Sequence, residues 1–482
     1  MAEKEEEAAK IESFLQWAAA NLGISDSPPS TIPSEHSTLP RYCLGHSLIV
    51  SNFPDAGGRG LAAARDLRKG ELILRVPKKA LMTSECLMRN DQTLSASIKR
   101  HAFLSSTQIL TVALLNEVNK GSNSWWSNYL KQLPRSYDTL AGFGPFEIQA
   151  LQVDDAIWAA EKAVAKAKLE WEEASLVMVD LKLKPTLLNF KAWLWASATI
   201  SSRTMHIPWD EAGCLCPVGD FFNYAAPAEE PCDHETVGTC TNGTLVQTEG
   251  LFDASAQRLT DAGYEEDVAA YCFYASRNYR EKEQIFLSYG VYTNLELLEH
   301  YGFLLNDNPN DKAFIPLEPA MRSLCSWPKE LLYINQDGKP SFALLSAMRL
   351  WATPSNKRRS VGHLAYSGKQ LSFENEITVI GWIAKKCQDI LRNLKTSVEQ
   401  DKLLLNIIDK IEDSLLPLEL EKLPSICGSE LYAFLESHDV ANGEDFTNLY
   451  VSQKSRRSIC RWKFAIQWRL SYKRKLLYCS AE

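Results

Sequence analysis

The feature that most constrains the fold is an alternation of β-rich and helical stretches along the 482 residues of the chain. Residues 45–84 and 206–310 carry short apolar runs bounded by glycine turns, such as Leu72–Pro77, and these are typical of strands. Residues 85–205 and 311–482 instead carry apolar residues at helical spacing. We therefore expect an α+β protein in which the two β-rich stretches form one domain, split by a helical insertion.

The periodicity also places individual elements. We expect helices over residues 8–22, 109–118, 153–181, 189–202, 376–394, 401–415 and 457–477. We expect strands at His46–Val50, Leu72–Pro77 and Ile285–Tyr289, with Asp55–Gly60 as a glycine-rich turn.

The composition, 45% hydrophobic and 23% charged residues, is that of a globular protein with a sizeable core. A net charge of −8 does not favour nucleic-acid binding through a general basic field. The acidic start of the chain lacks the features of a secretory signal or transit peptide, and no apolar run is long enough to span a membrane. We expect a monomer in the cytoplasm or nucleus with reduced thiols and no direct nucleic-acid or membrane partner.

Three short motifs place polar groups beside glycine, and each alone has an ordinary structural explanation. Gly57–Leu61 fits a hairpin turn, although its glycines would also let the backbone approach a ligand. Asp220–Tyr224 holds an acid and an amide three residues apart, which fits an Asx turn or a polar ligand site. Tyr289 and Tyr301 each precede glycine, and such tyrosines are commonly core aromatics with a satisfied hydroxyl.

In this order, the motifs resemble the SET-domain protein methyltransferases, in the branch typified by the plant Rubisco large-subunit lysine methyltransferase. The resemblance runs from about residue 45 to residue 310, and the helical tail is similar to the C-terminal substrate-binding domain of that branch. The matching segments are Gly58–Leu61, Lys69–Pro77, Trp126–Pro134, Ser202-Arg203, Asp220–Tyr224 and Glu283–Phe303.

The resemblance implies a SET β-fold with a pseudoknot and an all-α C-terminal domain. It implies the following division: an N-terminal helix and Ser/Pro-rich loop (1–44), the first part of the SET domain (45–84), the helical insertion (85–205), the second part of the SET domain (206–310) and the substrate-binding domain (311–482). It also implies transfer of a methyl group from S-adenosyl-L-methionine to a lysine of another protein, histone or non-histone. No metal is implied.

The resemblance further implies which residues serve the reaction. Cofactor contacts are implied for Gly58, Arg59, Gly60, Arg203, Asp220, Asn223, Tyr224, Tyr289 and Tyr301. Arg203 would pair with the cofactor carboxylate, and Asn223 would bind the amino-acid end. Tyr289 would be catalytic, its hydroxyl orienting the target amine and the methyl group, and Tyr301 would pack against the cofactor or line the channel. The lysine must be neutral to attack, and a desolvated channel would lower its pKa from ~10.4.

Three departures from the branch stand out. Gly57 occupies a position where the branch usually has glutamate, and Tyr224 one where it has histidine. The loop over residues 225–269 is longer and more acidic than expected. These departures leave open a catalytically weak SET-fold module that binds other proteins. A histidine-directed methyltransferase is a further alternative, but that class carries asparagine and tryptophan where this chain has Met205 and Gly219.

Two other features admit different functions. Soft ligands cluster at Cys214, Cys216, Cys232, His234 and Cys240, which could form a zinc site, although no clean pair of C-x-x-C knuckles is present. The expected C-terminal helix alternates basic and apolar residues, which is typical of a membrane or nucleic-acid surface or, more commonly, of a helix whose apolar stripe packs on its own domain.

Overall fold

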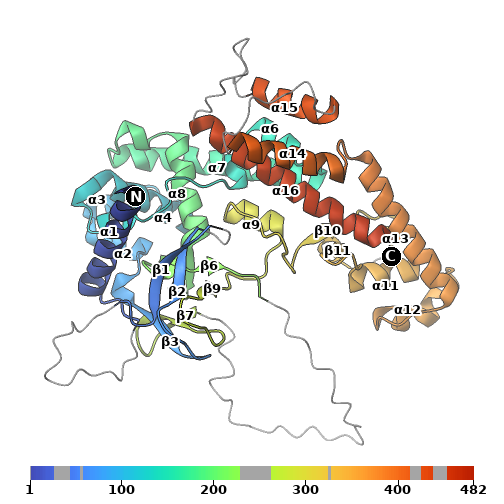
Figure 1. The fold of residues 1–482 in the computed structure, drawn as a ribbon, viewed down its shortest axis with the longest axis horizontal. Helices are drawn as coiled ribbons and strands as arrows, with labels where there is room; N and C mark the ends of the chain where they lie inside the picture. Colours follow the sequence, from blue (N-terminus) through green and yellow to red (C-terminus); the bar gives the residue numbers. More distant parts are fainter. Residues whose placement is uncertain are drawn as a thin grey trace, which may run out of the picture. The chain divides into compact units, whose positions relative to one another are not determined.

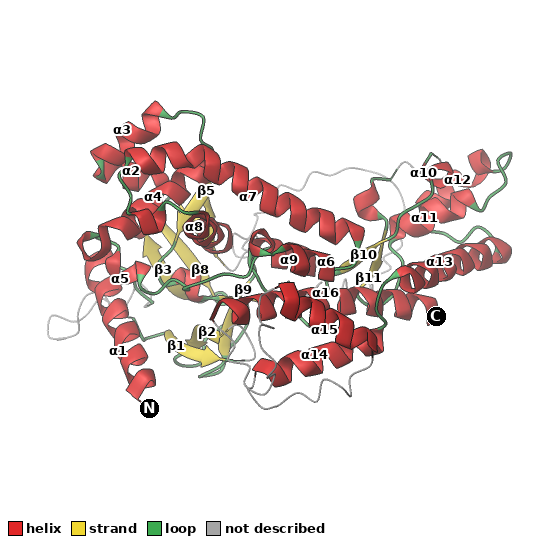
Figure 2. Ribbon diagram, turned by 90° about the horizontal axis from the view of Figure 1, so that it is seen from above, coloured by secondary structure: helices red, strands yellow, loops and turns green. Residues whose placement is uncertain are grey.

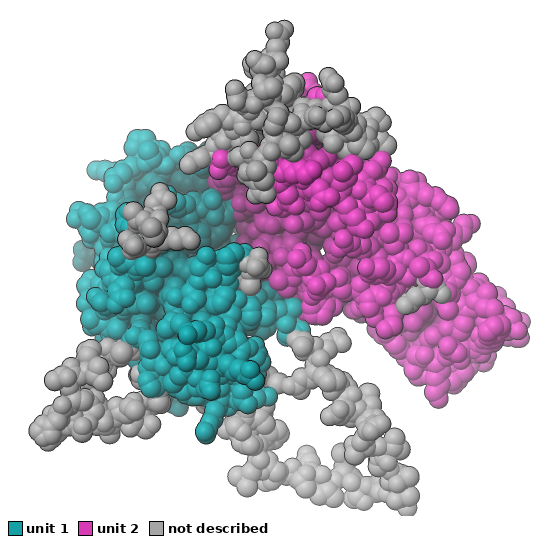
Figure 3. Space-filling view, viewed as in Figure 1, with its two compact units in different colours: residues 1–137, 167–291 teal, residues 138–166, 292–482 magenta. Residues whose placement is uncertain are grey.

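The computed structural model describes residues 2–26, 44–54, 58–227, 262–323, 327–412, 425–437 and 453–481. The chain divides into two compact units (Figure 3). Unit 1 comprises residues 1–137 and 167–291, and unit 2 comprises residues 138–166 and 292–482. Neither unit is one continuous stretch of chain.

Unit 1 contains helices α1 (Ala2–Trp17), α2 (Ser84–Asn90), α3 (Gln92–Arg100), α4 (Ser106–Lys120), α5 (Ser127–Leu130) and α8 (Phe190–Arg203), with a π-helical turn η1 (Ala18–Leu22) after α1. Its strands are β1 (Leu48–Phe53), β2 (Gly58–Ala63), β3 (Leu72–Pro77), β4 (Thr204–Ile207), β5 (Asp210–Leu215), β6 (Asn223–Tyr224), β7 (Ala262–Glu265), β8 (Ala270–Tyr274) and β9 (Gln284–Leu287). Helix α7 (Asp154–Asp180) contains the division between the units, after Lys166.

Unit 2 contains α6 (Pro145–Ala150), α9 (Asn294–His300), α10 (Pro319–Arg322), α11 (Phe342–Trp351), α12 (Arg358–Tyr366), α13 (Phe373–Asn393), α14 (Val398–Glu412), α15 (Ser425–Ser437) and α16 (Gln453–Ala481). Its strands β10 (Lys312–Phe314) and β11 (Tyr333–Asn335) form a two-stranded sheet.

The strands of unit 1 form small sheets rather than one large sheet (Figure 1). The four-stranded sheet has the order β1-β2-β9-β6, and β3-β8-β7 and β4-β5 form two further sheets. Strand β6 runs parallel to β9 and pairs Asn223 with Phe286 and Tyr224 with Leu287. This pairing brings the segment after residue 219 alongside the strand that leads to Tyr289.

Helices α1–α5 and α8 pack along these strands and complete a mixed core (Figure 2). Leu61 and Phe273 from strands and Leu114 and Trp193 from helices are all buried in this core. Helix α8 begins where the Asn189 side chain accepts the Ala192 amide, which satisfies one of the free N–H groups of its first turn. The helix ends at Arg203. Because α8 is packed in the core, its position fixes where the Arg203 guanidinium can lie.

Most of the expected elements are confirmed, including the strand at Leu72–Pro77 and the helices over 153–181 and 189–202. The expected glycine turn is wrong in its second half, because Gly58 opens strand β2 and pairs with Phe53. Gly58 has a φ of +77°, which glycine adopts without steric cost and which lets the strand start directly. Residues 55–57, including Gly57, lie outside the described part of the chain.

Helix α16 is the central element of unit 2 and contacts α6, α13, α14 and β10. Its apolar residues Ile459, Trp462 and Ile466 are buried, which confirms that this stripe packs on its own domain. The basic side chains do not all face water, however. Arg469 is fully buried, and so, to within 2%, are Lys473 and Lys475.

Each of these buried cations has an acidic partner. Arg469 lies 2.8 Å from Asp401 and 2.9 Å from Glu430, and Lys473 lies 2.6 Å from Asp401. Lys475 pairs with Asp311. Burial lowers the pKa of both lysines, and their carboxylate partners oppose that shift. These cations are therefore part of the core of unit 2 rather than a surface for membranes or nucleic acid.

No helix among the described residues has both the length and the apolar composition needed to cross a membrane.

Candidate functional site

The structure brings most of the predicted site residues together in unit 1. They come from strand β2, the end of helix α8, the segment from Gly219 to Tyr224, and the chain just after β9. Tyr301 is the exception, because it belongs to unit 2. There its hydroxyl lies 3.4 Å from that of Tyr292, and the two rings meet edge to face.

An ion pair between Arg203 and Asp220 lies at the centre of this group. The Arg203 Nη1 donates to the Asp220 backbone carbonyl at 2.8 Å and lies 3.2 Å from its carboxylate Oδ2. The Arg203 Nε donates to the Tyr137 hydroxyl at 3.2 Å. The remaining nitrogen, Nη2, has no hydrogen-bond partner within the described residues, and the side chain is 20% exposed. Arg203 is thus held firmly while keeping donor capacity for a ligand.

The Asp220 carboxylate has a different environment, since its side chain is only 1% exposed. Its Oδ2 also accepts the Tyr129 hydroxyl at 2.9 Å. Burial raises the pKa of Asp220, and Arg203 opposes that shift. Burial alone would lower the pKa of Arg203, but Asp220 and the nearby tyrosines raise it above its ordinary value. The pair is therefore a mutually stabilised charge pair, supported by tyrosine hydroxyls.

Arg59 contacts the same region from strand β2. Its guanidinium stacks on the Phe221 ring at 4.3 Å and donates to both the side chain and the backbone carbonyl of Gln132. Burial lowers the pKa of Arg59. These contacts link β2 to the segment that follows α5, so the Arg59 side chain has a clear structural role.

Gly60 and Asn223 approach each other closely between β2 and β6. A Cβ atom at Gly60 would lie 2.5 Å from the Asn223 Nδ2 and 3.1 Å from the Gln284 Nε2, so any side chain here would have to displace the Asn223 amide. Only glycine fits here without displacing Asn223. The absence of a side chain lets the half-buried Asn223 amide pack directly against the buried backbone of β2.

Tyr289 and Tyr224 form a reciprocal contact, which we call the tyrosine clasp. The Tyr289 hydroxyl donates to the Phe222 backbone carbonyl, and the Tyr224 hydroxyl donates to the Gly290 carbonyl at 2.9 Å. Their ring centroids lie 5.1 Å apart at an angle of 40°. Burial raises the pKa of Tyr289 to about 12, so its hydroxyl stays protonated at neutral pH.

Three residues of this group were not predicted as site residues. They are Tyr129, Gln132 and Tyr137, which hold Asp220, Arg59 and Arg203 respectively. Two of them lie within Trp126–Pro134, a segment that the sequence analysis matched to the family without assigning it a role at the site. A buried tyrosine gives no sequence signal that separates a core residue from one that supports a charge pair.

The cysteine cluster is described only in part. Cys214 and Cys216 are buried free thiols, and burial raises the pKa of both. Cys232, His234 and Cys240 lie outside the described residues. The residues that are described contain no group of three or more His, Cys, Asp or Glu side chains that could hold a metal ion.

Comparison with known proteins gives two family matches. The SET domain model matches residues 58–290, and the Rubisco LSMT substrate-binding model matches residues 278–421. The Arabidopsis thaliana protein SET DOMAIN GROUP 40 is 54% identical over 477 residues, covering 97% of this chain and 94% of the relative. The actin-histidine N-methyltransferase of Xenopus tropicalis is 26% identical over 408 residues, covering 77% and 64%.

A solved structure shares the fold. The SET domain of LSMT bound to lysine and AdoHcy superimposes with a TM-score of 0.58 at 16% sequence identity. The match covers 98% of this chain and 90% of that one.

Proposed function

This chain belongs to the SET-domain family, and from that premise we propose that it is a protein-lysine N-methyltransferase that uses S-adenosyl-L-methionine. The observation that carries the proposal is the juxtaposition of Arg203, Asn223 and Tyr289 in unit 1. Of the LSMT structures that share the fold, one is bound to lysine and AdoHcy and another to AdoMet. The C-terminal region, which matches a substrate-binding model, would bind the protein substrate.

The residues of the site suit such a cofactor. Within the described residues, the Arg203 Nη2 has no hydrogen-bond partner, and it can bind a carboxylate. Gly60 lets the half-buried Asn223 amide lie against β2, and an amide offers both a donor and an acceptor for the amino-acid moiety of the cofactor. When bound, S-adenosyl-L-methionine would supply a methyl group on a positively charged sulfur, which an amine can attack.

Tyr289 would orient the amine rather than remove its proton. Its own hydroxyl hydrogen is committed to the Phe222 carbonyl, so the oxygen presents lone pairs that can accept an N–H from the amine. Because the pKa of Tyr289 is about 12, the residue is not a base at neutral pH. The lysine must therefore arrive neutral, through desolvation, and the contribution of Tyr289 is alignment.

Asp220 and Tyr224 would act through their neighbours. The buried Asp220 carboxylate fixes Arg203, and Tyr224 fixes Tyr289 and Gly290 through the tyrosine clasp. In this proposal both are positioning residues. The clasp also gives a reason why tyrosine can stand where the branch usually has histidine, since its hydroxyl reaches a backbone carbonyl.

Packing around Gly219 favours lysine over histidine as the target. The histidine-directed class has tryptophan at the position that corresponds to Gly219. A Cβ at Gly219 would lie 2.6 Å from the Phe273 Cζ and 2.7 Å from the Cys216 Sγ, so a tryptophan does not fit in this packing. The chain would act as a monomer in the cytoplasm or nucleus.

Calorimetry with S-adenosyl-L-methionine is the first test, and we expect saturable binding that Asn223→Ala weakens. The matched control is Asn123→Ala, an exposed asparagine of the same unit. Labelled-methyl transfer into a cell extract, followed by mass spectrometry, should then identify a methylated lysine. No binding at millimolar cofactor would refute the proposal, and label on histidine alone would replace the lysine assignment with the histidine-directed one.

A further inference from the structure

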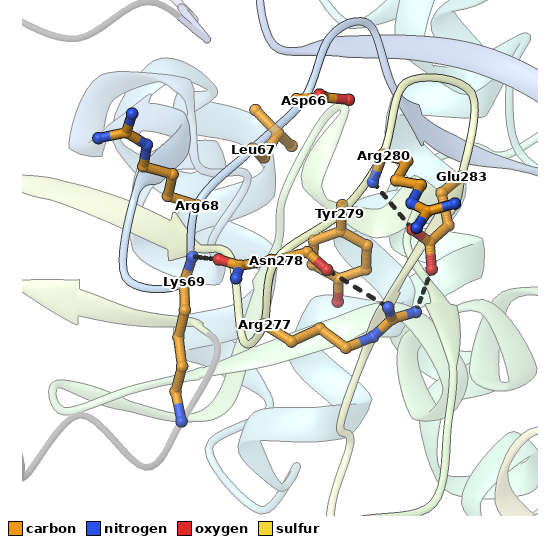
Figure 4. Close-up of a pocket in the computed structure, with 9 residues that line it drawn as sticks. All are labelled: Asp66, Leu67, Arg68, Lys69, Arg277, Asn278, Tyr279, Arg280 and Glu283. Atoms are coloured by element: carbon orange, nitrogen blue, oxygen red, sulfur yellow. Dashed lines mark hydrogen bonds and ion pairs between the residues drawn. The ribbon is translucent and has the colours of Figure 1, made fainter.

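A hollow of about 790 Å³ lies in unit 1, and none of the residues of the candidate site lines it. Two neighbouring turns form its walls, residues 66–69 between β2 and β3 and residues 277–280 between β8 and β9, and Glu283 completes the lining (Figure 4). No part of the proposed reaction uses these residues, so the hollow calls for a separate explanation.

The two turns are locked to each other by their backbones. The Leu67 amide donates to the Tyr279 carbonyl at 2.9 Å, and the Tyr279 amide donates to the Leu67 carbonyl at 3.0 Å. The Lys69 amide donates to the Asn278 side chain at 2.9 Å. A ligand would therefore meet a preformed surface, which reduces the entropy lost on binding.

The acidic and basic side chains that line the hollow differ in how far they are already engaged by neighbouring groups. Both carboxylates are tied to the turns: Asp66 accepts the Glu281 amide, and Glu283 accepts the Arg280 amide and pairs with Arg277 at 2.6 Å. Arg68 and Lys69 are exposed, and their charged groups make no hydrogen bond or ion pair with the described residues. Four cations against two carboxylates make this surface positive on a chain whose net charge is −8.

From this arrangement we propose that the hollow binds an acidic, extended segment of a polypeptide. The side chains of Arg68 and Lys69 point away from each other in Figure 4, so they do not converge on one small anion. An extended chain carrying several carboxylates can instead reach each of them in turn. This inference does not depend on the methyltransferase activity, although a protein substrate could carry such a segment.

A nucleic acid fits the hollow less well. Single-stranded nucleic acids gain much of their affinity from bases that stack on exposed aromatic rings. The single aromatic residue lining the hollow, Tyr279, is 3% exposed, and the Arg277 guanidinium covers its ring at 4.4 Å. The hollow thus offers charge without a stacking surface.

The test uses the full chain and a short fluorescein-labelled peptide of alternating glutamate and glycine, followed by fluorescence anisotropy at low salt. Arg68→Glu/Lys69→Glu should weaken binding by about tenfold or more, because reversing two charges turns attraction into repulsion. Asp66→Asn keeps the oxygen that accepts the Glu281 amide but removes a negative charge, so it should tighten binding. The matched control, Lys357→Glu/Arg359→Glu, changes the net charge equally on two exposed residues of unit 2, one just before α12 and one in its first turn, and should leave binding unchanged.

Three results would overturn the inference: equal weakening by the two double variants, displacement of the peptide by inorganic phosphate at equal charge concentration, or tighter binding of an oligonucleotide of equal charge. Melting temperatures of all variants separate loss of binding from loss of folding. Methyl transfer and cofactor binding are measured in parallel, so that failure of this inference is distinguishable from failure of the proposed activity.

Discussion

The role of the Tyr289 hydroxyl can be tested by a substitution that removes only its oxygen atom. Tyr289→Phe keeps the ring against Tyr224 and removes the bond to the Phe222 carbonyl, so stability should fall by only about 0.5–1.5 kcal/mol. Turnover should fall ~10²-fold or more, because alignment of the amine matters most in the transition state. Cofactor affinity should change little. Rates on the identified substrate and melting temperatures measure both effects, and an unchanged rate would make Tyr289 a structural residue.

Tyr224 offers a second test, of whether it acts through Tyr289. Tyr224→Phe removes the hydroxyl that holds the Gly290 carbonyl, and we expect about tenfold slower turnover with unchanged cofactor affinity. In a Tyr289→Phe background the same change should reduce turnover hardly at all, because the effects of substitutions in residues that act as a unit are not additive. If Tyr224 instead contacts the cofactor directly, affinity falls and the loss persists in the double variant. Tyr224→His, which restores the residue usual in the branch, provides a comparison.

The order of the motifs allowed Arg203, Asn223 and Tyr289 to be predicted as site residues, and their roles remain predictions. The contacts that these residues make could not be predicted in the same way. That the Asp220 carboxylate is buried against Arg203 and Tyr129 could not be predicted, because those residues are separated by up to 91 positions and meet only through packing. The tyrosine clasp likewise depends on the parallel pairing of β6 with β9, which leaves no local sequence pattern.

Helix α16 carries a buried charge network whose disruption should be costly. Asp401 serves both Arg469 and Lys473, so Asp401→Asn leaves two buried cations short of a partner. We expect a loss of about 3–5 kcal/mol in unfolding free energy. Urea denaturation followed by tryptophan fluorescence would report it, since Trp462 and Trp468 belong to α16.

Asp409→Asn is the matched control for this change. Asp409 of α14 pairs with Lys463 of α16 at 2.8 Å, but the Asp409 side chain is 52% exposed. Exposed pairs contribute about 0–1 kcal/mol, so this substitution should be nearly silent. Equal effects of the two substitutions would contradict a special role for the buried network.

Helical periodicity located α7, α8, α13 and α16 to within a few residues, because their apolar faces are long enough to read. The same periodicity did not show which cations of α16 are buried. A lysine in a helix is usually exposed to water. Lys473 and Lys475 can be buried because Asp401 and Asp311, which are distant in the sequence, pair with them.

The two compact units make a specific prediction for a chain that ends at Asn310. Leu140, Leu151 and Leu298 are fully buried in the core of unit 2, much of which comes from residues beyond 310. Without those residues, their apolar side chains would be exposed, and we expect aggregation in light scattering. Co-expression of residues 311–482 as a separate chain should restore solubility. A monodisperse, folded shortened chain would contradict this division of the core.

The interleaving of the units has a consequence for synthesis. Residues 138–166 leave the ribosome long before the partners that bury them, because α16 follows them far along the chain. At a translation rate of about 5–20 residues per second, those apolar side chains wait many seconds for their core. Nascent chains of this protein should therefore occupy chaperones that shield exposed apolar segments until termination. Codon choices that slow translation after residue 291 would lengthen that vulnerable interval.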